Sequence, residues 1–185
     1  SVSIPASVQT IETSAFMSCS ALTSITIPDG VTTISGGVFS GCRSLTAVSL
    51  PESITSIEEN AFGYCEALTS FTVPSGVTSI PKYAFMGCKS LAEIKLHDKI
   101  TTIGPQAFYL CTALKQINIP NSVTRIYDRA FLSCTSLESV TIPNGINKIY
   151  EGTFQNCPAL VSVSIPESVT TIENSAFAEC KALSN

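Results

Sequence analysis

Eight cysteines and one histidine are the side chains of this sequence whose chemistry could build a site. The cysteines recur with a constant 23-residue spacing. They are Cys19, Cys42, Cys65, Cys88, Cys111, Cys134, Cys157 and Cys180. Thiols in such numbers could form disulfides, bind a metal ion or supply a nucleophile. Their fixed spacing helps to decide among these alternatives.

Every cysteine lies three residues after a phenylalanine and three residues before a leucine, which is the pattern of a core position. Stacked copies of this segment would hold neighbouring thiols one coil apart, with their side chains pointing the same way. A disulfide requires Cβ atoms about 3.8 Å apart and suitably angled. We therefore expect free, buried thiols that act as small apolar side chains.

The single histidine, His97, stands where the other copies of the pattern carry proline. It could be a ligand or a catalytic base, or it could be a tolerated substitution at an exposed turn. No serine, cysteine or carboxylate is held at a defined spacing beside it, and the sequence has no C-x-x-C pair. A lone histidine without such partners does not make a site. The sequence thus predicts no catalytic residue, no metal site and no cofactor.

The residues around the cysteines show what must position them, because the whole pattern repeats with the same 23-residue period. Phenylalanine recurs at 16, 39, 62, 85, 108, 131, 154 and 177, and leucine at 22, 45, 68, 91, 114, 137, 160 and 183. A fixed period of this length is typical of a solenoid, in which each period is one coil stacked on its neighbours. We predict that residues 1–185 form a single array of eight repeats. No atypical capping repeat is visible, so we expect an excerpt of a longer chain.

Within one period the alternation Leu22-x-x-Ile25-x-Ile27 predicts a short strand that ends at Pro28. Val31-x-x-Ile34 predicts a second short extended segment. The stretch from Ala15 to Cys19 has neither alternation nor β-branched residues, which favours a helical or 3₁₀ turn. The expected fold class is α/β but β-rich: a solenoid with parallel strands stacked along one face and short helical or 3₁₀ turns on another.

The repeat resembles the BspA-like leucine-rich repeat, whose pattern is IPxxVTxIxxxAFxxCxxLTxIxIP. Ile119-Pro120, Val123-Thr124, Ala130-Phe131, Cys134 and Leu137 follow this pattern. The resemblance implies large surface proteins of mucosal bacteria and protozoan parasites, which adhere to host matrix proteins, host cells or other microbes. It also implies that the repeat carries no catalytic residues. The expected partner is a protein or a glycan, and the expected location is extracellular or on the cell surface.

Charge limits the possible partners further. The chain has a net charge of −4 and a pI near 4.9, and only 13% of its residues are charged. Residues 82–115 form a basic belt, with five lysines against two acidic residues. This belt does not extend along the chain, so nucleic-acid binding is not expected. No apolar run approaches the length of a membrane span, so membrane insertion is not expected either.

The outward positions of the predicted strands suggest where a ligand would bind. They are generic Ser, Thr and Ala in the first coils and become charged or amide side chains in the middle of the array. The candidate ligand-binding residues are Glu93, Lys95, Lys115, Gln116, Asn118 and Glu138. Three adjacent strands would hold them in one patch, since neighbouring strands lie about 4.8 Å apart.

A second candidate interface lies on the side of the predicted turns. Met86, Tyr109 and Leu132 share one position of the repeat on consecutive coils, with Leu110 beside them. Neighbouring exposed apolar residues can mark an interface, although these could also shield the core. Two functions therefore stay open, a binding module of the adhesin type and a structural spacer within a larger surface protein, while an enzyme has no supporting constellation.

Overall fold

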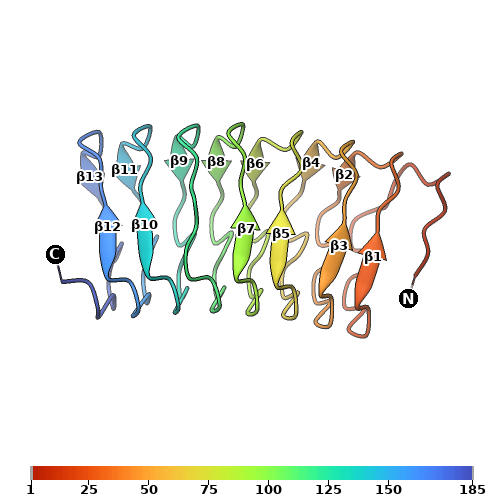
Figure 1. Ribbon diagram of the computed structural model, residues 1–185, viewed down its shortest axis with the longest axis horizontal. Coiled ribbons are helices and arrows are strands. Elements are labelled where there is room, and N and C mark those ends of the chain that lie inside the picture. Colours follow the sequence, from red (N-terminus) through yellow and green to blue (C-terminus); the bar gives the residue numbers. More distant parts are fainter. Residues whose placement is uncertain (1, 185) are drawn as a thin grey trace.

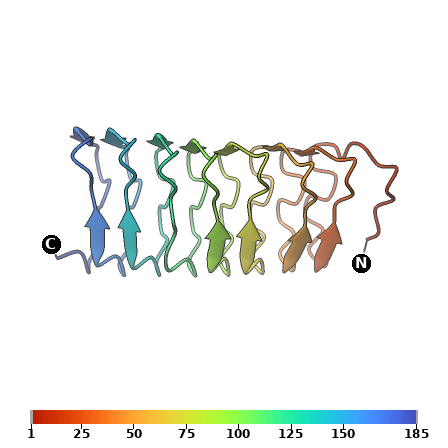
Figure 2. The same ribbon diagram turned by 45° about the horizontal axis from the view of Figure 1, so that its top comes forward.

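The computed structural model describes residues 2–184, which form a rod of stacked coils with the chain ends at opposite ends of the rod (Figure 1). A coil is one 23-residue period of the chain. Each coil crosses two faces of the rod, and the strands of the two faces stand in two separate rows when the rod is turned (Figure 2). The parallel-strand solenoid predicted from the sequence is thus confirmed.

The first row of strands forms the strand face, which takes up the Leu-x-x-Ile-x-Ile part of the repeat. It consists of β1 (Ser24–Thr26), β3 (Ala47–Ser49), β5 (Ser70–Thr72), β7 (Glu93–Lys95), β10 (Ser139–Thr141) and β12 (Ser162–Ser164). The central residue of each strand points inward, and its two neighbours are exposed. This alternation follows from the two-residue period of side chains along a strand.

The second row forms the short-strand face. It consists of β2 (Thr33–Ile34), β4 (Ser56–Ile57), β6 (Ser79–Ile80), β8 (Thr102–Ile103), β9 (Arg125–Ile126), β11 (Lys148–Ile149) and β13 (Thr171–Ile172). All strand pairs on both faces are parallel, and each residue pairs with its equivalent one period further on, as Ser24 does with Ala47. The sequence period therefore sets the register of the sheets.

The hydrogen-bonded ladder of the strand face is interrupted between β3 and β5 and again between β7 and β10. Strands β1–β3, β5–β7 and β10–β12 form separate two-stranded sheets. Residues 116–118, on the coil between β7 and β10, are not a strand, and Gln116 forms a single parallel bridge to Ser139. Figure 1 shows this coil without an arrow between β7 and β10.

A column of phenylalanines forms the centre of the rod. Consecutive rings from Phe16 to Phe177 are stacked with centroids 5.3–5.8 Å apart, and the six from Phe39 to Phe154 are fully buried. Phe71 on β5 adds a further ring, 4.9 Å from Phe62 and 4.8 Å from Phe85. The core is therefore continuous along the rod.

The cysteine column lies beside the phenylalanines. All eight thiols are free, and all except Cys19 are buried. From Cys42 to Cys180, each Sγ–H donates to the carbonyl oxygen of the phenylalanine 26 residues earlier, at 3.1–3.3 Å. Burial raises the pKa of Cys42 to about 11 and the pKa values of Cys88 and Cys157 to about 12. These thiols are core groups that stay protonated at neutral pH.

The predicted helical or 3₁₀ turns are wrong, because the described residues contain only hydrogen-bonded turns in this part of the repeat. Twelve non-glycine residues and four glycines have positive φ, and they occupy two positions of the repeat, four residues apart. Gln106 (φ 52°) and Leu110 (φ 62°) are one such pair. A helix cannot hold two left-handed residues in one turn.

Backbone hydrogen bonds explain why the turn replaces the helix. The N–H groups of Ala107, Tyr109 and Cys111 donate within their own coil, to the carbonyl three residues earlier. The alternating N–H groups of Gln106, Phe108 and Leu110 donate instead to carbonyls of the next coil, at 2.8–3.1 Å. In a helix all of these donors would be used within the segment. The left-handed residues release every second donor to join neighbouring coils.

Candidate binding site

The interruption of the strand face between β7 and β10 coincides with a groove of about 600 Å³. Its floor is formed by Ile94, Ile117 and Val140, the inward residues of three consecutive coils. Its polar lining comes from Glu93 and Lys95 on β7, Gln116 and Asn118 on the unpaired coil, and Ser139 and Thr141 on β10. The groove thus has an apolar floor flanked by both charge signs and by amide groups.

The structure brings four of the six predicted ligand-binding residues together in this groove: Glu93, Lys95, Gln116 and Asn118. The other two, Lys115 and Glu138, are exposed beside it, one residue before Gln116 and Ser139. The backbone N–H of Glu138 donates to the carbonyl of Lys115 at 2.9 Å, so these two positions are also adjacent across coils.

The ion pair between Lys95 and Glu93 in the groove is weak. The Nζ of Lys95 lies 3.5 Å from Oε1 of Glu93, and both side chains are more than half exposed, at 67% and 61%. An exposed ion pair of this kind contributes only about 0–1 kcal/mol to stability. Both groups can therefore turn to a ligand at little cost to the fold.

The residues of the second candidate interface are neither buried nor fully exposed. Met86, Tyr109, Leu110 and Leu132 are all half-buried. Their position also has a structural use, because the carbonyls of Met86, Tyr109 and Leu132 accept the backbone donors of Tyr64, Gly87 and Leu110. These side chains cover the turns that join the coils and present only part of their apolar surface to solvent.

His97 is half-buried beside a second groove of about 530 Å³ that lies over β3 and β5. The backbone N–H of Lys99 donates to Nδ1 at 3.2 Å. Nε2 lies 2.9 Å from the carbonyl oxygen of Pro74, so the neutral ring donates from Nε2. Both ring nitrogens are thus used in holding the turn, which the sequence alone did not indicate.

Two further features bear on the chemistry of the surface. Within residues 2–184 no group of three or more His, Cys, Asp or Glu side chains is placed to hold a metal ion. The part of the chain that the structure describes contains no helix with the length and apolar character needed to cross a membrane.

Sequence reasoning gave little weight to a cluster on the short-strand face. The rings of Tyr127 and Tyr150 lie next to each other in a tilted arrangement, with centroids 5.8 Å apart, and Arg125 and Lys148 lie over their rings. The shared repeat position of the two tyrosines was visible in the sequence. The sign that would have revealed the cluster is the change from Ser or Thr to Arg125 and Lys148 two residues earlier.

Solved structures of bacterial proteins resemble this rod. A leucine-rich repeat protein of T. pallidum has a TM-score of 0.65 and 28% identity, covering 95% of this chain and 71% of that one. A leucine-rich cell surface protein of Faecalibacterium prausnitzii A2-165 has a TM-score of 0.63 and 27% identity, covering 97% and 70%. A leucine-rich repeat protein of Bacteroides ovatus ATCC 8483 has a TM-score of 0.54 and 28% identity, covering 97% and 64%.

Comparison with curated proteins gives no match. The family profile of the BspA-type leucine-rich repeat region matches residues 1–81 and 55–184, in six copies. The matched segments together span nearly the whole sequence, and the repeat pattern, the parallel strands and the solved structures agree with them. The chain belongs to the BspA-type leucine-rich repeat family.

Proposed function

We propose that this chain is a non-catalytic binding module of the adhesin type, exposed on a cell surface or outside the cell, which recognises a host or microbial protein or glycan. The observation that carries this proposal is the groove on the strand face. It lies where the generic Ser, Thr and Ala of the first coils give way to Glu93, Lys95, Gln116 and Asn118. Solenoids bind through such extended faces, because side chains of successive strands line up there.

The family and the similar structures support the coarser part of this proposal. Leucine-rich repeat folds present a face to a partner, and the similar F. prausnitzii protein is a cell surface protein. The charges in the groove would speed the encounter with a polar ligand more than they would deepen its affinity. Met86, Tyr109, Leu110 and Leu132 form the alternative interface.

The second candidate function is a structural spacer. It is favoured by the first coils, whose outward residues Thr23, Ser24 and Thr26 are generic. A spacer would hold another domain away from the cell and would tolerate changes to the groove without loss. The two functions therefore make opposite predictions for groove variants.

The test is a binding assay with immobilised fibronectin, fibrinogen, laminin and collagen, and with whole mucosal and microbial cells. For any probe that binds, Lys95→Glu with Lys115→Glu should weaken binding by about tenfold or more, because charge-assisted contacts contribute about 1.5–3 kcal/mol each. The melting temperature should change little, since both lysines are exposed.

The matched control is Lys99→Glu with Lys181→Glu, which makes the same change of charge outside the groove. It should leave binding intact. Full binding by the groove variant, with loss on Tyr109→Ser and Leu132→Ser, would move the site to the turn side. Binding to none of the probes by the wild-type chain would favour the spacer.

A further inference from the structure

The short-strand face changes its character in two adjacent coils. The first residue of each short strand is Ser or Thr in β2, β4, β6 and β8, and becomes Arg125 in β9 and Lys148 in β11. Two residues further on, Pro81 and Gly104 are replaced by Tyr127 and Tyr150. Basic and aromatic side chains therefore appear together on a face whose other side chains at these two positions are small, polar or acidic.

The two tyrosine rings are not packed as the core phenylalanines are. Their planes are tilted by 34°, whereas the neighbouring phenylalanine pairs of the same coils deviate by 9° or less. Both tyrosines are half-buried. The backbone N–H of Tyr127 donates to Ile103, and the residue in register on that coil is Gly104. No side chain stands in register with Tyr127 on that side.

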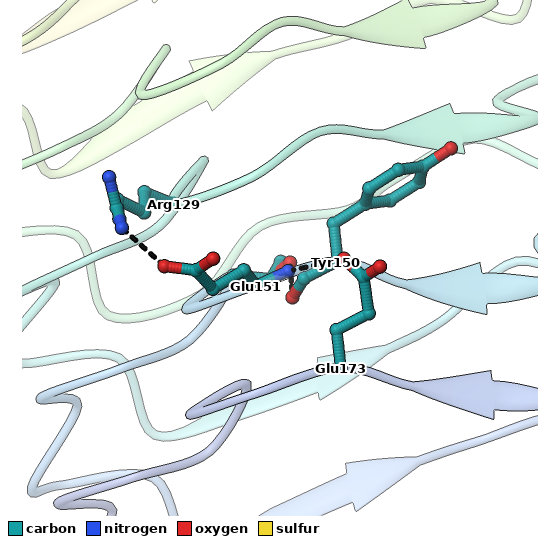
Figure 3. A network of polar contacts seen from close by, with 5 residues as sticks. Arg129, Tyr150, Glu151 and Glu173 are labelled. Atoms are coloured by element: carbon teal, nitrogen blue, oxygen red, sulfur yellow. Dashed lines mark hydrogen bonds and ion pairs between the residues drawn. The ribbon is translucent and has the colours of Figure 1, made fainter.

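The cations around the rings differ in how they are matched. Lys148 forms an ion pair with Glu173 at 2.6 Å, and Arg129 forms one with Glu151. Figure 3 shows Arg129, Glu151 and Glu173 linked in this network, with the ring of Tyr150 extending away from the Arg129–Glu151 pair. The backbone N–H of Glu151 also donates to Glu173 at 3.0 Å.

Arg125 is the basic residue of this cluster whose charge is unmatched. Its Nη1 donates to the hydroxyl of Tyr127 at 3.2 Å, and its guanidinium lies 5.6 Å from the ring centroid. Among the described residues no carboxylate lies within ion-pair distance of it. A guanidinium has five N–H donors in a fixed fork that matches a carboxylate. Most of these donors stay available for a ligand.

We propose that Arg125 and Tyr127 form a second binding site, separate from the strand-face groove, for a terminal sugar acid. The pyranose ring packs against the Gly104 side of Tyr127, where its C–H groups meet the negative face of the aromatic ring. The carboxylate accepts the fork of Arg125. A long polyanion does not fit, because the other two cations are already paired and the chain is acidic overall.

The test is an NMR titration of the isotope-labelled chain with 3′-sialyllactose, lactose and N-acetyl-aspartate. Sialyllactose should shift the ring signals of Tyr127 and the side-chain signals of Arg125. Lactose, which lacks the carboxylate, and N-acetyl-aspartate, which lacks the ring, should each bind at least about tenfold more weakly, since a hydrogen bond to a charged group contributes a factor of this size.

Variants assign the effect to the two residues. Arg125→Gln and Tyr127→Ala should each weaken sialyllactose binding by about tenfold or more, and Arg125→Lys should restore part of it because the charge returns without the fork. Tyr83→Ala is the matched control. Lys82 lies 4.6 Å from the centroid of the Tyr83 ring, so this site also combines a cation with a tyrosine, but it lacks the neighbouring Gly104. The amide spectrum shows whether each variant keeps its fold.

No shift with sialyllactose at millimolar concentration would overturn the proposal. Equal binding of lactose would overturn the role of Arg125, and equal binding of N-acetyl-aspartate would point to an acidic peptide instead of a sugar. Binding that Lys95→Glu with Lys115→Glu abolishes, while Arg125→Gln does not, would assign the sugar to the strand-face groove. The proposal for Arg125 and Tyr127 and the proposal for the strand-face groove can therefore be contradicted independently of each other.

Discussion

Individual side chains in this rod have environments that repeat from coil to coil, so a single residue can stand for its column. Phe108 is fully buried between Phe85 and Phe131, at centroid distances of 5.7 and 5.3 Å. Phe85 and Phe131 are themselves stacked on further rings, so they cannot move to fill the cavity that truncation of Phe108 would leave. The cost of removing one ring should therefore lie at the upper end of that for core residues.

Phe108→Ala should lower the free energy of unfolding by about 3–5 kcal/mol, as large-to-small core changes do. Urea unfolding followed by circular dichroism measures the loss. Val161→Ala is the control, because Val161 is 52% exposed and its truncation should change stability little. Equal stability of Phe108→Ala and the wild-type chain would contradict the burial of this column.

The buried thiols should make the rod sensitive to alkaline pH. The pKa of Cys88 is raised by burial to about 12, against an ordinary value near 9. The folded chain therefore favours the protonated thiol, and this contribution to stability is complete below pH 9 and is lost as the pH rises towards 12. Each such thiol should cost about 1.4 kcal/mol per pH unit above its ordinary pKa.

Urea unfolding of the wild-type chain and Cys88→Ala at pH 8, 9.5 and 10.5 measures this dependence. The stability of the wild-type chain should fall more steeply, and the difference between the two slopes isolates Cys88 from tyrosine and lysine titration. Parallel slopes would show that the thiol titrates normally. At neutral pH a thiol reagent should modify Cys19, which is exposed, and reach the other seven thiols only on unfolding.

At the scale of the element, the turn between the two strands is the part that the sequence predicted wrongly. The Ala-Phe-x-x-Cys segment has the residue types of a helix, and its apolar spacing fits one helical turn. The actual conformation depends on hydrogen bonds to carbonyls of the next coil, as from Leu110 to Leu132. The strands were predictable because the two-residue alternation and the proline are local signals.

A pair of substitutions at Gln106 distinguishes the turn from a helix. Gln106 has a φ of 52° and donates its N–H to Asp128 at 3.1 Å. Gln106→Gly should leave stability unchanged or raise it by up to about 1 kcal/mol, because glycine relieves the left-handed strain. Gln106→Pro should cost about 3 kcal/mol or more, since proline fixes φ near −65° and removes the donor.

Thermal and urea unfolding of the two Gln106 variants give the sign of each effect. A helix would reverse the expectation for glycine, which destabilises a helix interior by about 1 kcal/mol. Loss of about 1 kcal/mol of stability in Gln106→Gly would therefore restore the helical interpretation, whereas Gln106→Pro should be destabilising in either conformation.

At the scale of the whole molecule, the sequence predicted the architecture well and the surface in part. The 23-residue period predicted the parallel register, and the outward alternation placed Glu93, Lys95, Gln116 and Asn118 on one patch. It could not show that the ladder opens between β3 and β5 and between β7 and β10, because this depends on hydrogen bonds that side-chain type does not encode. The unmatched charge of Arg125 was equally hidden, since Glu151 and Glu173, the partners of Arg129 and Lys148, come from the neighbouring coil.

The constant offset of the bonds between coils also bears on how such a chain changes over generations. Strand pairs join equivalent positions of neighbouring coils, as Ser24 and Ala47 do, and the turn donors keep an offset one position shorter, as from Leu110 to Leu132. Removing or duplicating one whole period by recombination within a gene would leave both offsets intact in every remaining coil. The length of the rod can then change in steps of one coil while the packing between coils stays the same. Lineages can therefore lengthen or shorten the rod while each binding surface stays on its own few coils.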